Sequence, residues 1–97
     1  MFLTTGVAQN PRAYWGMYGA TKAGMENLVA TWAAEVESTP LRVNLVDPGP
    51  VATKLRAAAY PGEDQAKLPQ SADIAPGLAA FCLPAETRHG ARVRLGG

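Results

Sequence analysis

Three short apolar segments are separated by longer amphipathic or irregular stretches. They cover Met1–Thr4, Leu41–Val46 and Ala91–Leu95. Continuously apolar or β-branched runs of this length, ending in Gly or Pro, are typical of strands in a buried sheet. In the last segment Arg92 and Arg94 alternate with apolar residues, which predicts that one face of that strand is solvated.

The segment between the first two predicted strands has the pattern of one long helix. From Tyr14 to Ser38 it contains no proline and many good helix formers. One stripe at helical spacing consists of Tyr18, Lys22, Met25, Val29, Trp32 and Val36. Strand, helix and strand in succession predict parallel pairing with a right-handed crossover.

Shorter helices are predicted between the second and third strands. Thr53 is placed to cap a short helix that runs through Ala58, and Ser71 to cap another from Ala72 to about Phe81. Residues 60–69 are predicted to form an irregular excursion. The fold class is therefore α/β, with three parallel strands adjacent in chain order, one long helix on one face of the sheet, and shorter helices.

The composition indicates a folded protein and excludes several partners. Of the 97 residues, 47% are hydrophobic and 18% are charged, and nine basic against eight acidic residues give a formal charge of +1. This balance favours neither nucleic acid nor a membrane surface as a partner. The single cysteine, Cys82, is expected to be buried and to indicate a cytoplasmic location with no metal site. His89 is expected to be a surface residue.

Tyr18 and Lys22 stand four residues apart in the predicted long helix, so the phenol and the ammonium share one face. An ammonium held near a phenol favours the phenolate, which would allow Tyr18 to exchange a proton near neutral pH. The same spacing suits plain packing of a lysine stem on a tyrosine ring. The pair alone leaves both interpretations open.

Three motifs together resemble the short-chain dehydrogenase/reductase family. They are Thr4-Thr5-Gly6 after the first strand, the run from Tyr18 through Ala20-Thr21-Lys22-Ala23-Gly24, and Pro48-Gly49-Pro50-Val51-Ala52-Thr53 after the second strand. The resemblance extends over nearly the whole chain, up to Gly96-Gly97 after the last strand. It implies that the three strands are the last three of a Rossmann-like, doubly wound parallel sheet.

The resemblance also implies roles for these residues. Tyr18, Lys22 and Thr5 would be catalytic, with Tyr18 as the general acid or base toward a substrate oxygen. Thr5 stands where the family usually has serine, and it keeps the hydroxyl donor but adds a methyl group that restricts χ1. The cofactor-binding residues would be Tyr18, Lys22, Pro48, Gly49, Val51 and Thr53, with the Val51 backbone and the Thr53 hydroxyl near the nicotinamide carboxamide.

The family's dinucleotide-binding half has no counterpart in the sequence. There is no glycine-rich phosphate loop and no residue that would choose between NAD and NADP. We therefore expect residues 1–97 to be a C-terminal catalytic fragment of a single domain. By family it would be an NAD(P)-dependent oxidoreductase of a small carbonyl compound or secondary alcohol. Alone it would contact only the nicotinamide end of NAD or NADP and would be inactive.

Two alternatives remain open from the sequence. A non-catalytic fragment would associate with a full-length family member, or with its own copy, through the long helix, which commonly packs between subunits in this family. A small α/β binding protein unrelated to hydride transfer would require the motif agreement to be chance. Turnover of NAD(P)H favours the enzyme, and association without cofactor binding favours the non-catalytic fragment. An uncovered edge of the first strand would itself promote association.

Overall fold

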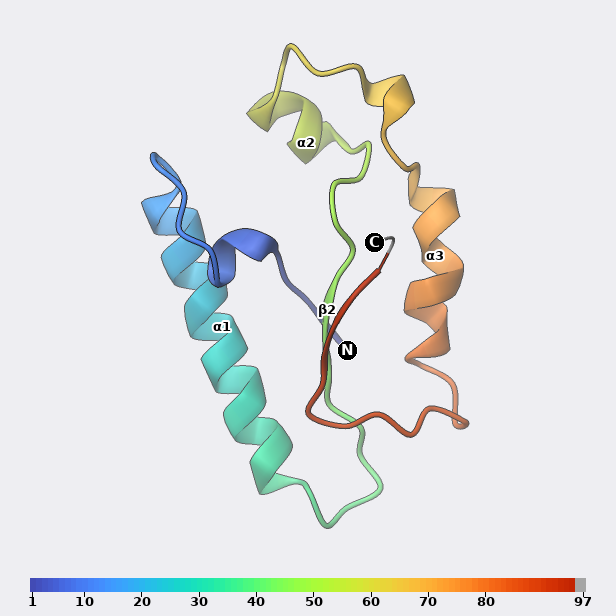
Figure 1. Cartoon of the computed structure of the whole chain (residues 1–97). Helices are drawn as coiled ribbons and strands as arrows, with labels where there is room; N and C mark the ends of the chain where they lie inside the picture. The colour runs from blue at the N-terminus through green and yellow to red at the C-terminus, as the bar shows by residue number, and fades with distance from the viewer. Residues whose placement is uncertain (96–97) are drawn as a thin grey trace.

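The computed structural model describes residues 1–95, in which three strands form one sheet with helices on both sides (Figure 1). Gly96-Gly97, which entered the family resemblance, lie outside the described residues. The elements in chain order are β1 (Phe2–Leu3), the short 3-10 helix η1 (Gly6–Ala8), α1 (Gly16–Glu35), β2 (Leu45–Asp47), α2 (Lys54–Ala59), the 3-10 helix η2 (Gln65–Lys67), α3 (Ser71–Ala80) and β3 (Arg92–Arg94).

The sheet confirms the predicted order and direction of the strands. β2 lies between β1 and β3 and is parallel to both. Leu45 pairs with Phe2 on one side and with Arg92 on the other. All three carboxyl ends therefore point to the same edge of the sheet, which is the upper edge in Figure 1.

The long helix is shorter at both ends than the sequence predicts. α1 begins at Gly16 because Tyr14 adopts a φ of 72°, a left-handed conformation that cannot continue a right-handed helix. It ends at Glu35, and a turn in which the Thr39 N–H donates to the Val36 carbonyl then leads to Pro40.

The apolar core lies between α1 and one face of the sheet. Val29 and Ala33 of α1 pack with Val43 and Leu45, and Met25 and Val36 border them. The predicted stripe is thus right for three of its apolar members, but Ala33 takes the buried position beside Val29 and Trp32 stays 40% exposed. The Trp32 ring instead meets Phe2 edge to face, with centroids 6.1 Å apart.

Helix α3 lies across the sheet from α1 in Figure 1 and packs on the end of β3 through a glycine. A Cβ added at Gly77 would lie 3.2 Å from a methyl carbon of Leu95. The predicted cap at Ser71 is wrong by one residue. Gln70 is the N-cap, because the Asp73 carboxylate accepts a 2.8 Å hydrogen bond from the Gln70 N–H.

Three expectations about single residues near the C-terminus are also wrong. The Cys82 side chain is exposed rather than buried. His89 is half-buried, where its Nδ1 accepts from the Val43 N–H at 3.1 Å and its Nε2 lies 2.8 Å from the Ala33 carbonyl oxygen. Arg92 turns toward α1 instead of toward solvent. Among residues 1–95, no helix combines the length and hydrophobicity needed to cross a membrane.

Candidate active site

The predicted site residues come from three segments that meet at the carboxyl edge of the sheet. Thr5 follows β1, the turn from Pro48 to Thr53 follows β2, and Tyr18 and Lys22 lie in the first turns of α1. Figure 1 shows η1, the start of α1 and α2 gathered at this edge. Ligands of open parallel sheets bind at this edge, so the topology collects the candidate residues in the expected place.

Tyr18 and Lys22 are held together on one face of α1. The Lys22 ammonium lies 6.0 Å from the centroid of the Tyr18 ring, which is the outer limit of a cation–π contact. Tyr18 is 37% exposed, so its phenol is accessible at the surface. The lysine stands beside the ring, as both the chemical and the packing interpretations of the pair require.

η1, which begins directly after Thr5, packs closely on α1. A Cβ added at Gly19 would lie 3.2 Å from a methyl carbon of Val7, so the absence of a side chain lets the two elements approach. Thr5 is extended, with φ −149° and ψ 156°, and its side chain does not cap η1. Its hydroxyl is therefore not consumed by that helix.

The turn after β2 is shaped by its own hydrogen bonds. The buried Asp47 carboxylate accepts from the Gly49 N–H at 2.9 Å, and Gly49 has a φ of 72°, which favours glycine. Thr53 caps α2 as predicted, because its hydroxyl oxygen accepts from the Arg56 N–H at 3.1 Å. The cap uses one lone pair of the Thr53 hydroxyl oxygen and leaves the hydroxyl proton to donate elsewhere.

An aromatic and cationic cluster lies beside Tyr18. The Trp15 ring meets Tyr18 edge to face at 5.7 Å and stacks on Tyr60 at 5.8 Å. Arg12 donates to the Tyr60 hydroxyl, and Arg56 lies 3.8 Å from the centroid of the Tyr60 ring. The sequence carries no signal that pairs Trp15 with Tyr60, because the two residues are 45 positions apart.

Arg56 of this cluster is itself paired. Its Nε and Nη2 bind the two Glu63 carboxylate oxygens at 2.7 and 2.9 Å. The hydrogen bond from Arg56 lowers the pKa of Glu63 below its ordinary value, against the smaller opposing effect of desolvation. This ion pair links α2 to the irregular segment that follows it. It therefore helps to hold Tyr60, which lies between the two paired residues, against the Trp15 ring.

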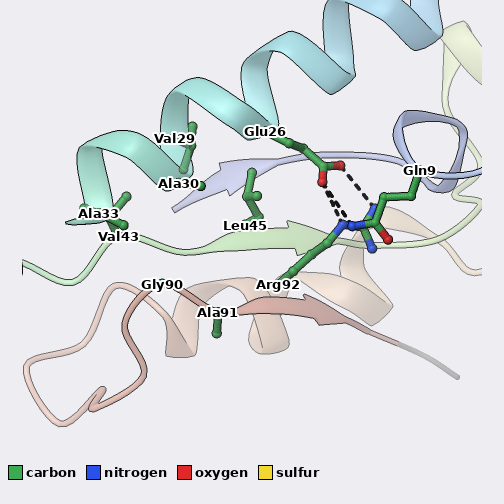
Figure 2. Close-up of a pocket in the computed structure, with 10 residues that line it drawn as sticks. All are labelled: Gln9, Glu26, Val29, Ala30, Ala33, Val43, Leu45, Gly90, Ala91 and Arg92. Carbon is green, nitrogen blue, oxygen red and sulfur yellow. Dashed lines mark hydrogen bonds and ion pairs between the residues drawn. The ribbon is translucent and has the colours of Figure 1, made fainter. Parts of the chain in front are cut away.

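A second polar cluster, which the sequence did not reveal, lies between α1 and the sheet. Arg92 of β3 binds both Glu26 carboxylate oxygens, at 3.0 and 3.2 Å, and Gln9 donates to the same carboxylate (Figure 2). Burial alone would raise the pKa of Glu26, but the hydrogen bonds from Arg92 and Thr4 and the positive charge of Arg92 together hold it below its ordinary value. Glu26 is thus an ionised, part-buried residue.

This cluster closes one end of a small cavity with a volume of about 220 Å³. The rest of the lining is apolar and includes Val29, Ala33 and Leu45. Figure 2 shows Arg92 reaching from β3 up to Glu26 above the sheet. Sequence signals for the pair were weak, because Glu26 and Arg92 are 66 positions apart.

The chain is similar, in sequence and in structure, to oxidoreductases and short chain dehydrogenases. YciK of Escherichia coli K12, named an uncharacterized oxidoreductase, is 41% identical over 76 residues, which are 78% of this chain and 30% of that protein. A short chain dehydrogenase from Salmonella enterica serovar Typhi superposes with a TM-score of 0.88 at 35% identity, over 96% of this chain and 39% of that one. A short chain dehydrogenase from E. coli CFT073, crystallised with NADPH, superposes with a TM-score of 0.86 at 35% identity, over the same shares of the two chains.

These relatives are longer than the chain. The matched part of the chain covers 30% of YciK and 39% of each of the two solved structures. The profile of the short chain dehydrogenase family matches residues 1–64, which include β1, α1, β2 and the turn that ends at Thr53. The chain therefore belongs to the short chain dehydrogenase family.

Proposed function

We propose that the chain supplies the proton-transfer and nicotinamide-facing part of an NAD(P)-dependent oxidoreductase that interconverts a carbonyl compound and a secondary alcohol. The observation that supports this proposal is that Thr5, the Tyr18–Lys22 pair and the Pro48–Thr53 turn all belong to segments at the carboxyl edge of one parallel sheet.

The turn after β2 fits the nicotinamide end of NAD or NADP. The Thr53 proton is left to donate by the capping geometry, and the hydrogen bonds of residues 1–95 include none from the Val51 N–H, although Val51 is buried. Both are donors suited to a carboxamide oxygen. Pro48 and Gly49 would form the floor beneath the ring, and Tyr18 and Lys22 would face the nicotinamide ribose.

The proposed chemistry divides between cofactor and protein. The bound reduced nucleotide would supply the hydride to the carbonyl carbon. Tyr18 would donate its proton to the carbonyl oxygen, and the Thr5 hydroxyl would hydrogen-bond the same oxygen. The Lys22 ammonium beside the ring would stabilise the phenolate that remains, and in the oxidative direction Tyr18 would remove the hydroxyl proton.

A nucleotide also needs a cradle for its pyrophosphate, and no glycine-rich loop occurs in these 97 residues. We propose that residues 1–97 form the C-terminal catalytic part of a single Rossmann-like domain and are inactive alone. The test fuses this chain behind the dinucleotide-binding part of the E. coli CFT073 relative, and this fusion is called the reconstituted enzyme below. Carbonyl-dependent oxidation of NAD(P)H by the reconstituted enzyme but not by the isolated chain is expected. Equal turnover by the isolated chain would overturn the proposed division.

A second candidate function is association through α1, with a copy of the chain or with a full-length relative. It is favoured by the exposure of large apolar side chains on that helix, with Met17 at 83% and Leu28 at 70%. Light scattering of the isolated chain should show oligomers that Leu28→Glu dissociates. A monomer at all concentrations would exclude self-association through α1.

A further inference from the structure

The cluster of Thr4, Gln9, Glu26 and Arg92 has no part in the proposed function so far. We propose that Glu26 and Arg92 are positioning residues that fix the backbone of Thr5 relative to the helix carrying Tyr18 and Lys22. This inference rests on the proposed function, because it assigns the pair a purpose in placing the Thr5 hydroxyl at the substrate oxygen.

Arg92 holds Thr5 directly. Its Nη2 donates to the Thr5 carbonyl oxygen at 3.0 Å while its Nε and Nη2 also bind Glu26. A guanidinium presents its donors in one rigid plane, so a bidentate contact on one side fixes the direction of the donor on the other. The position of the Glu26 carboxylate therefore determines where Arg92 holds the Thr5 carbonyl oxygen.

Glu26 ties the same point to α1. It follows Lys22 by four residues and Tyr18 by eight, so all three project from neighbouring positions on one helix face. The Glu26 carboxylate also accepts from the buried Thr4 hydroxyl at 2.5 Å. One carboxylate thus binds Thr4 itself and, through Arg92, Thr5.

Thr5 needs such support because it lies beyond the paired part of β1. The strand is two residues long, and the last ladder hydrogen bond on this side runs from the Thr4 N–H to the Val46 carbonyl. A β-branched side chain has few χ1 choices, so its hydroxyl follows the backbone closely. A misplacement of about 1 Å in a catalytic group can cost on the order of a hundredfold in rate.

The test is a double-mutant cycle in the reconstituted enzyme. Arg92→Met should lower kcat about tenfold with less than about a twofold change in KM for the nucleotide, and in a Thr5→Ala background it should lower kcat by less than about twofold. Arg92→Lys should recover part of the loss, because it restores the charge. Arg42→Met is the matched control, since Arg42 is exposed and, within residues 1–95, its side chain binds only the carbonyl of its own neighbour, Leu41. It should leave kcat unchanged.

Equal losses from Arg92→Met in both backgrounds would overturn the positioning role, as would no loss at all. If Arg92→Met does not fold, Glu26→Gln replaces it in the cycle, because it keeps the size and one acceptor of the carboxylate. Tyr18→Phe, measured in the same series, separates the two proposals. Full turnover by that variant defeats the proposed function, whereas lost turnover together with an additive cycle defeats the positioning role alone.

Discussion

The indole ring of Trp15 stacks on the phenol ring of Tyr60, with centroids 5.8 Å apart and an interplanar angle of 28°. This stack joins the entry of α1 to the segment that follows α2. Stacked aromatic pairs contribute on the order of 1 kcal/mol beyond their buried area. Trp15→Ala should therefore destabilise residues 55–70. Their amide hydrogen exchange should become roughly tenfold faster, while exchange in β2 should change little.

Tyr14→Ala is the matched control for this change. It removes a neighbouring aromatic ring that is fully exposed and makes no aromatic contact among those of residues 1–95. Exchange in residues 55–70 should not respond to it. Equal acceleration by both variants would show that the stack does not hold the segment.

The backbone of Tyr14 predicts a stabilising substitution. Its φ of 72° is unfavourable for a bulky residue and costs about 1 kcal/mol or more, and glycine adopts it without a clash. Tyr14→Gly should raise the free energy of unfolding in urea by roughly 1 kcal/mol. Ala13→Gly, one position earlier, should lower it or leave it unchanged. A loss of stability in Tyr14→Gly would mean that the strain is not present in solution.

The ion pair of Glu26 and Arg92 predicts a specific dependence on pH. Because the pKa of Glu26 is lowered on folding, its stabilising contribution is present above the unfolded pKa of about 4.5 and is lost as the pH falls through the folded value. Glu26→Gln should thus be less stable than the wild type at pH 7, by on the order of 1 kcal/mol, and the gap should close below about pH 4.5.

Urea unfolding of the reconstituted enzyme between neutral and acidic pH measures this gap. Glu35→Gln provides the control, because Glu35 is exposed near the end of the same helix. Its difference from the wild type should stay small at every pH. A gap for Glu26→Gln that widens toward acid would contradict the assigned direction.

Patterns within short stretches predicted most of the fold. The strand order follows from the βαβ arrangement, and Thr53 caps its helix because a cap depends on residues three positions away. The cap predicted at Ser71 is wrong by one residue, although it too depends only on residues nearby in the sequence. Ser71 is the first residue of the helix, and Gln70 before it is the cap, because the Asp73 carboxylate accepts from the Gln70 N–H.

Relationships across the fold could not be predicted in this way. Alternation along β3 indicated a solvated Arg92, because periodicity reports which residues share a face and not what covers that face. The carboxylate that binds Arg92 is 66 positions away, and the partner of Trp15 is 45 positions away. The candidate site was predicted as a set of motifs, and the contacts that Glu26, Arg92 and Tyr60 make beside it could be seen only in three dimensions.

We propose that Tyr18 transfers the proton to and from the substrate oxygen. Tyr18→Phe removes only the phenolic hydroxyl and keeps the ring that meets Trp15. In the reconstituted enzyme we predict that this variant lowers kcat by at least about a hundredfold while the dissociation constant of NADPH changes less than about threefold. Near-normal kcat in the Tyr18→Phe enzyme, with NADPH still bound, would show that Tyr18 does not transfer this proton.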